Sequence, residues 1–151
     1  VSTAKGLAFS LNIPVIAVST LESIAQPYLN KGMRVRPMMD ARRMEVFTAL
    51  FSSDGQLLEE ANAKIVDETT FKEELTNFKT IFCGNGVPKC TEILRQFENA
   101  SVENEVLSAR NMASIVSRKF QNSEFEDVAY FEPFYLKDYV AGKPNVKGLH
   151  S

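Results

Sequence analysis

The chain has 151 residues, of which 44% are hydrophobic and 10% aromatic, enough to bury a sizeable core. Its formal net charge of -2 argues against a protein that holds nucleic acid by bulk positive charge, because phosphate binding needs clustered Lys and Arg. No apolar run approaches the roughly 20 residues that span a bilayer, so we expect a cytoplasmic protein.

The chain opens on a helix that is already under way at residues 1–9, with no capping residue before it. Asn12 and Pro14 should end this helix, because Asn is favoured at helix C-termini and Pro cannot continue a helix. Residues 15–18 are an apolar run typical of a buried strand. We therefore expect the back part of a larger protein, with this helix and strand forming half of an α/β unit.

The second helix is predicted from Ser19 to about Tyr28. Glu22 follows Ser19 at the spacing of a capping box, in which each side chain accepts a hydrogen bond from the other residue's free backbone N–H. In the first helix, four apolar side chains must pack against a sheet or a partner: Ala4, Leu7, Ala8 and Leu11.

A connection at about Asn30 leads to two predicted strands, at residues 36–40 and 43–51. Both faces of the second strand are apolar, which indicates a central strand. A turn at Asp54 and Gly55 and a returning antiparallel strand at residues 56–66 complete a hairpin.

Helices and strands then alternate. Thr70 and Glu73 form a second capping-box pattern, which predicts a helix to about Asn77, and residues 80–83 read as a strand. Further helices are expected from Pro88 and from Ser108. The sequon at residues 99–101 is interpreted as a plain loop, and the tail at residues 129–140 as aromatic and extended, with residues 142–144 closing the folded part.

Three short motifs have both a plain and a functional interpretation. The tight turn of Gly84, Asn85 and Gly86, between a strand and a helix, could cradle a phosphate, although a lone Gly-x-Gly is more often an ordinary turn. Ser2 and Lys5 match a Ser-x-x-Lys nucleophile motif whose companion motifs are absent, so we interpret the match as chance. The spacing of the two cysteines suits neither a redox pair nor paired zinc ligands, which favours reduced core cysteines.

The order of elements predicts a two-lobed α/β protein that lacks most of its first lobe. In this interpretation residues 1–29 are the remnant of the N-terminal lobe, and residues 30–151 are a complete C-terminal α/β lobe.

The chain resembles the bacterial TsaB (YeaZ) family of threonylcarbamoyladenosine biosynthesis proteins. The resemblance runs from Ser2 to about Pro144, and four blocks in the right order carry it: STAKGLA at residues 2–8, IPVIAVSTLE at residues 13–22, MDARRMEVF at residues 39–47 and PFYLK at residues 133–137.

The resemblance implies an actin-like, Hsp70-like (ribonuclease H-like) two-lobed fold. It also implies a non-catalytic scaffold or activator subunit in the modification of an adenosine beside the tRNA anticodon. Such a subunit would bind the catalytic paralogue TsaD through its first lobe, with the helix that carries Leu7 at the interface. The further partners implied are the ATPase TsaE, a second copy of the chain in a homodimer, and tRNA only through the complex; no membrane partner is implied. No resident cofactor is expected, and ATP or ADP at a shared interface remains open.

The catalytic sister in this resemblance binds a metal through two histidines four residues apart on one helix, a spacing that puts both on one face. The matching positions here are Thr20 and Ile24, which have no imidazole. Glu22 is assigned to the helix cap, and the only histidine, His150, falls in a tail expected to be frayed. We therefore expect no metal site, which weakens the rival hypothesis of a glycoprotease-type metallopeptidase or a nucleotide hydrolase of the actin-like superfamily.

Three charged residues near the predicted strand end have two interpretations. Asp40, Arg42 and Arg43 could be a solvated edge, or they could serve as a cleft ion pair or as a contact with a partner or RNA phosphate. In the sister, a Ser-Gly-Gly turn approaches a phosphate in the region of residues 40–42. Asp40 and the side chain of Arg42 would oppose that approach, so nucleotide binding in the sister's manner is not expected.

Overall fold

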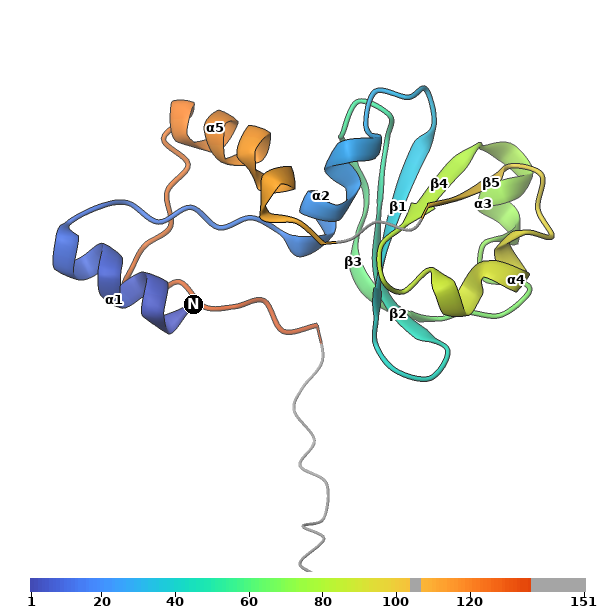
Figure 1. Cartoon of the computed structure of the whole chain (residues 1–151), viewed down its shortest axis with the longest axis horizontal. Coiled ribbons are helices and arrows are strands. Elements are labelled where there is room, and N and C mark those ends of the chain that lie inside the picture. Colours follow the sequence, from blue (N-terminus) through green and yellow to red (C-terminus); the bar gives the residue numbers. More distant parts are fainter. Residues whose placement is uncertain (104–106, 137–151) are drawn as a thin grey trace, which may run out of the picture.

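A computed structural model of the chain describes residues 1–103 and 107–136. Its centre is a five-stranded sheet of β1 (Arg34–Asp40), β2 (Glu45–Phe51), β3 (Leu57–Ile65), β4 (Thr80–Cys83) and β5 (Ala100–Glu103). The strand order is β3-β2-β1-β4-β5 (Figure 1). The first three strands form an antiparallel meander, and β4 and β5 add in parallel at the β1 side.

One face of the sheet is covered by short helical segments that follow its strands: α3 (Lys72–Asn77), the 3-10 turn η2 (Pro88–Cys90) and α4 (Thr91–Leu94). Phe82 of β4 is fully buried here, and its ring packs against Phe71 with centroids 5.2 Å apart. The buried cluster on this face also contains Met38, Val46, Leu75, Val87 and Leu94.

The other face is covered in part by α2 (Thr20–Ala25) and the 3-10 turn η1 (Gln26–Tyr28). Leu21, Ile24 and Tyr28 pack there against the sheet. The predicted helix from Ser19 to about Tyr28 is confirmed in extent. Both faces of β2 are therefore used, as its apolar pattern indicates.

A second part of the molecule lies beside the sheet rather than on it. It contains α1 (Ser2–Leu11), the 3-10 turn η3 (Ala109–Met112) and α5 (Ala113–Gln121) (Figure 1). Lys5 of α1 donates from Nζ to the carbonyls of Ala129 and Phe131 at 3.3 and 2.8 Å. Residues near both ends of the described chain are thus tied together, across the lobe boundary predicted at residue 29, and that boundary stays a prediction.

A buried arginine joins the sheet to α3. Arg36 of β1 is 2% exposed, and its Nε donates to Oε2 of Glu74 at 2.9 Å. Its Nη2 donates to Oε2 of Glu59 at 2.7 Å, and Glu59 is also paired with Lys64 at 2.6 Å. Thr80 completes the network by donating to Glu74 at 3.0 Å. The guanidinium of Arg36 therefore links β1 to β3 and α3, and Glu74 extends the network to β4.

Both predicted capping boxes are wrong in their hydrogen bonds. Ser19 does precede α2, but its side chain makes no capping hydrogen bond, and Glu22 instead pairs with Arg118 at 2.9 Å. At α3 the cap position is Phe71. Thr70 lies one residue earlier, where its amide and hydroxyl both donate to Asp67 at 2.9 Å. The Thr70 hydroxyl, which a capping box would need, is therefore hydrogen-bonded to Asp67.

The strand predicted at residues 15–18 is also wrong. Val15 makes one antiparallel bridge, to Glu126, and residues 15–18 are only half-buried. A strand forms only where neighbouring strands satisfy its backbone, and the described chain supplies a single bridge there. The opposite error occurs at residues 99–101, interpreted as a loop, where Ala100 begins β5 because β4 offers a parallel edge.

Other predicted boundaries lie close to those in the structure. Helix α1 ends at Asn12, which adopts a left-handed φ of 52°, as its sequence position predicts. The hairpin turn places Gly55 at φ 88°, and the strand at residues 80–83 matches β4. Ser108 caps η3 through its side chain. Of the predicted extended tail, residues 129–136 contain a turn and no strand, while residues 137–140, residues 142–144 and His150 lie outside the described residues.

Candidate functional site

The turn between β1 and β2 carries the charged residues that the sequence singles out. Arg43 was predicted to start a strand, but β2 begins at Glu45, and Arg42 and Arg43 lie in the turn itself. The turn is closed by hydrogen bonds from Ala41 N to Glu45 O at 3.1 Å and from Glu45 N to Arg42 O at 3.0 Å. Arg42 and Arg43 adopt φ values of 71° and 47°, a left-handed conformation that is costly for residues with a Cβ.

Asp40 holds this turn from the end of β1. Its Oδ1 accepts a hydrogen bond from the Arg42 amide at 2.9 Å and forms a short ion pair with Lys89. The hydrogen bond from Lys89 and then that from the Arg42 amide lower the pKa of Asp40 below its usual value. Lys89 also donates to the carbonyl of Glu45. The carboxylate and the ammonium thus fix both ends of the turn and neutralise each other.

The Gly84, Asn85 and Gly86 turn packs directly against β1. A Cβ at Gly84, where φ is 104°, would lie 2.5 Å from the carbonyl oxygen of Met38. The amide of Gly86 already donates to that carbonyl at 2.9 Å, and Oδ1 of Asn85 accepts from the Asp40 amide at 3.1 Å. These residues, which the sequence interprets as an ordinary turn or as a possible phosphate loop, contact the end of β1 in this structure. The phosphate interpretation stays untested.

The predicted interface residues of α1 differ in exposure. Ala8 is buried, at 4% exposed, whereas Leu7 and Leu11 are 58% and 64% exposed, and Ala4 is also exposed. Leu7 and Leu11 lie one turn apart on the same face of the helix. One side of α1 therefore packs within the chain, and an adjacent side presents two leucines to solvent.

Thr20 and Ile24, which match the positions of the sister's two metal-binding histidines, lie one turn apart on helix α2. Thr20 is exposed at the start of the helix, and Ile24 is buried in the core beneath it. Among residues 1–103 and 107–136, no group of three or more His, Cys, Asp or Glu side chains is arranged to hold a metal ion. Within the same residues, no helix is both long and apolar enough to cross a bilayer.

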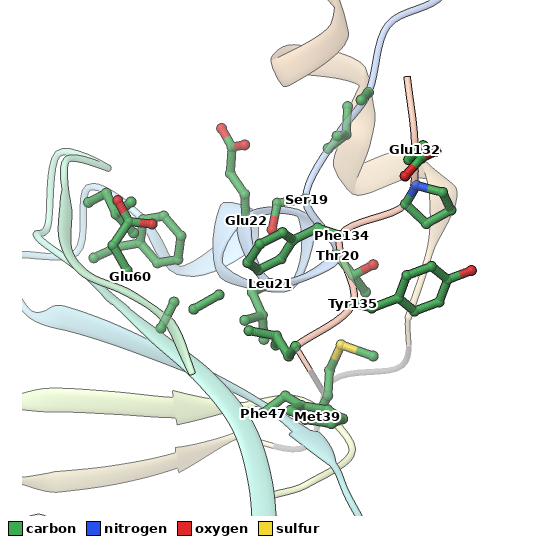
Figure 2. A pocket seen from close by; sticks show the side chains of 18 of the residues that line it. Ser19, Thr20, Leu21, Glu22, Met39, Phe47, Glu60, Glu132, Phe134 and Tyr135 are labelled. Atoms are coloured by element: carbon green, nitrogen blue, oxygen red, sulfur yellow. The ribbon is translucent and has the colours of Figure 1, made fainter. Parts of the chain in front are cut away.

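A large pocket that the sequence did not predict lies on the α2 face of the sheet (Figure 2). Its volume is about 960 Å³, and apolar side chains from the sheet form its floor: Met39, Phe47, Ala49, Phe51, Leu57 and Ala61. Figure 2 shows Phe134 and Tyr135, from the segment after α5, beside the start of α2. The apolar alternation along both faces of β2 was the signal that something must cover this face.

Comparison with known proteins decides the family. The family model described as "TsaD: tRNA N6-adenosine threonylcarbamoyltransferase" matches residues 1–149. The chain belongs to this family.

Two curated relatives agree with the resemblance given by the sequence blocks, and both are named tRNA threonylcarbamoyladenosine biosynthesis protein TsaB. The relative from Bacillus subtilis (strain 168) is 43% identical over 60 residues, which cover 40% of this chain and 26% of that protein. The relative from Escherichia coli (strain K12) is 28% identical over 151 residues, which cover 95% of this chain and 65% of that protein. The chain thus spans less than two thirds of the length of either relative.

Solved structures give the same fold. A Pseudomonas aeruginosa protein described by its similarity to peptidase YEAZ superposes with a TM-score of 0.69 at 23% identity, covering 89% of this chain and 64% of that one. YeaZ from the same organism superposes with a TM-score of 0.67 at 24% identity, covering 89% of this chain and 65% of that one. The predicted α/β fold of the actin-like, ribonuclease H-like class is confirmed, and so is the resemblance to TsaB and YeaZ.

Proposed function

We propose that the chain is a non-catalytic scaffold or activator subunit in tRNA threonylcarbamoyladenosine biosynthesis, and that it binds a TsaD-type catalytic paralogue through α1. The family match and the names of both relatives support the pathway. The observation that carries the interface is the exposure of Leu7 and Leu11 on a helix fixed to the chain by Lys5.

Helix geometry makes α1 a suitable docking element. Leu7 and Leu11 are spaced as paired anchors for helix-on-helix packing. The contacts from Lys5 to Ala129 and Phe131 hold the helix, so that a partner would meet a preformed surface. Two exposed leucines burying their side chains in a partner contribute roughly 1.5–3 kcal/mol each, enough to matter for assembly.

Residue chemistry supports the non-catalytic assignment. The positions that correspond to the sister's metal-binding histidines carry a hydroxyl at Thr20 and a buried alkyl chain at Ile24. Glu22, the remaining ionisable group of α2, is committed to Arg118. The rival function, a metallopeptidase or nucleotide hydrolase, would need its catalytic groups elsewhere.

Copurification tests the interface. We would coexpress the full chain with a tagged TsaD-type paralogue and compare Leu7→Glu/Leu11→Glu with Ser2→Glu/Phe9→Glu. The control adds the same charge on the opposite side of α1, because 100° per residue separates the two pairs by about half a turn. We expect only the first variant to lose the partner. Equal recovery of both variants would contradict the α1 interface.

Activity separates the two classes of function. Threonylcarbamoyl transfer to tRNA is measured with the chain alone, the paralogue alone and both together. A scaffold gives transfer only when both are present. Transfer, peptide cleavage or nucleotide hydrolysis by the chain alone would overturn the non-catalytic assignment.

A further inference from the structure

The β1–β2 turn has a backbone conformation that its sequence makes costly. Two consecutive residues with side chains, Arg42 and Arg43, both have positive φ. Each such residue costs roughly 1–2 kcal/mol, and Gly or Asn would occupy these positions with less strain. Strain of this kind persists only where the surroundings impose it, and it is concentrated at functional sites.

The surroundings that impose it are Asp40, Lys89 and Asn85. Asp40 accepts from the Arg42 amide, Lys89 bridges Asp40 and the Glu45 carbonyl, and Asn85 accepts from the Asp40 amide. Three separate contacts thus tie the turn to the first residues after β4. The turn is held in shape before any ligand arrives.

None of these contacts uses the side chain of Arg42 or Arg43. The charge of Asp40 is balanced by Lys89. Arg42 and Arg43 are both exposed, and neither is in an ion pair with any residue that the structure describes. Guanidinium groups donate two parallel hydrogen bonds to a phosphate or a carboxylate, and a fixed turn reduces the entropy lost when they do so.

We propose that this turn is a preset contact for the phosphate backbone of RNA, in which Arg42 and Arg43 donate to phosphates and Asp40, Lys89 and Asn85 hold them in position. The inference rests on the proposed function, which supplies the RNA. A chain of net charge -2 cannot attract RNA by its overall charge. Its contribution is therefore local: two phosphate contacts that orient tRNA bound mainly by the rest of the complex.

The test measures tRNA binding by the assembled complex of the full chain and its TsaD-type paralogue, using fluorescein-labelled tRNA and anisotropy at several salt concentrations. Arg42→Ala/Arg43→Ala should weaken binding about 10-fold at low salt and reduce the salt slope by about 2, one per lost phosphate contact. The control, Lys72→Ala/Arg95→Ala, removes two exposed cations elsewhere and should change the affinity less than about 2-fold. Equal effects of both variants, or no measurable tRNA binding by the complex, would overturn the proposal.

Two further variants separate position from charge. Asp40→Ala removes a negative charge, so bulk electrostatics predicts tighter RNA binding, whereas loss of the held turn predicts weaker binding; we expect weaker binding. Arg42→Gly/Arg43→Gly suits the positive φ values, so the thermal midpoint should hold or rise while RNA affinity falls. Tighter binding by Asp40→Ala would refute the preset turn.

Two outcomes distinguish this inference from the function on which it rests. If the wild-type chain does not copurify with the paralogue, the proposed function fails at that step. If the complex forms and transfers but Arg42→Ala/Arg43→Ala binds tRNA normally, only the RNA contact fails. If labelled poly-glutamate binds as tightly as tRNA at equal charge, and the double variant loses it, the turn recognises acidic proteins and the RNA assignment is overturned.

Discussion

The sheet region (residues 20–103) and the flanking region (residues 1–19 and 107–136) differ in how far they bury their apolar side chains. Nearly all the buried apolar residues belong to the sheet region, whereas Ala8 and Ile115 are the only buried residues among those described in the flanking region. The flanking region instead exposes large apolar side chains, including Phe134 at 81% and Tyr130 at 84%. The sheet region buries most of its apolar side chains in its own core, whereas the flanking region leaves most of its large apolar side chains exposed.

This difference bears on function because one proposed contact lies in the flanking region and the other lies in the sheet region. Leu7 and Leu11 belong to the flanking region, where burial by a partner is the favourable term. Arg42 and Arg43 belong to the sheet region, where a packed scaffold holds a strained turn. In these two proposals, docking would use exposed apolar side chains, and the charged contact would use a turn that hydrogen bonds hold in place.

The largest expected effect lies in the buried network of the sheet region. Arg36→Met leaves the carboxylates of Glu59 and Glu74 without the guanidinium that pairs them, and breaking a buried pair costs about 3–5 kcal/mol. At roughly 2–4 °C per kcal/mol for a chain of this size, the thermal midpoint should fall by about 6–20 °C. Calorimetry measures it, with exposed Arg95→Met as the control. A shift as small as the control's would show that the network contributes little stability.

Replacing a glycine by alanine should lower the stability of the protein in the sheet region and raise it in the flanking region. Gly84→Ala places a Cβ 2.5 Å from the Met38 carbonyl oxygen at a positive φ, so we expect destabilisation by at least about 2 kcal/mol. Gly6→Ala adds a Cβ in α1 with nothing within 4 Å, and Ala is the better helix former by up to about 1 kcal/mol. Urea unfolding of both variants compares the regions directly. Destabilisation by Gly6→Ala would mean that α1 is packed more closely than the structure shows.

In both regions the sequence predicted some elements and missed others. Strand β4 and the hairpin turn at Gly55 were predicted correctly, because an apolar run and an Asp-Gly pair determine them locally. The strand at residues 15–18 failed because its pattern is equally apolar but its pairing depends on neighbours elsewhere in the chain. Strand β5 was missed for the converse reason, since β4 recruits a short, weakly patterned segment.

The candidate site was predicted in composition but not in arrangement. The sequence singled out Asp40, Arg42 and Arg43, and a separate turn at Gly84 to Gly86. It could not show that Asn85 and Lys89 reach across to Asp40, because nothing local links residues more than 40 positions apart. The capping box predicted at Glu22 was wrong for the same reason. Ser19 is present at the required spacing, but the Glu22 carboxylate pairs with Arg118 of α5.

A third prediction uses acid to weaken the sheet region. Burial raises the pKa of Glu59, but hydrogen bonds from Lys64 and Arg36 outweigh it and lower the pKa from 4.5 to about 2. A carboxyl whose pKa is lowered by folding stabilises the folded state above its unfolded pKa, and that contribution is lost as the pH falls. Glu59→Gln should therefore be less stable than wild type at pH 7, and the gap should close between about pH 4.5 and pH 2.

Urea midpoints at pH 7, 4 and 3 measure this convergence. The matched control is Glu60→Gln, which makes the same change at an exposed neighbour on β3 and should give a small difference throughout. A gap between wild type and Glu59→Gln that stays constant down to pH 3 would show that Glu59 is not held ionised by its partners.

The smallest expected effect is at the ion pair that connects the two regions. Arg118 of α5 contacts Glu22 of α2 at 2.9 Å, with side chains 59% and 24% exposed. Pairs exposed to this degree contribute about 0.2–1 kcal/mol and are screened by salt. We expect Arg118→Gln and Glu22→Gln to destabilise by that amount at low salt, with a coupling in the double variant that disappears near 1 M salt. Urea unfolding of the four proteins in a double-mutant cycle measures this coupling. A coupling above about 2 kcal/mol that persists in salt would mean that α5 is fixed to α2 as firmly as the sheet region is fixed within itself, and the contrast between the two regions would not hold at this junction.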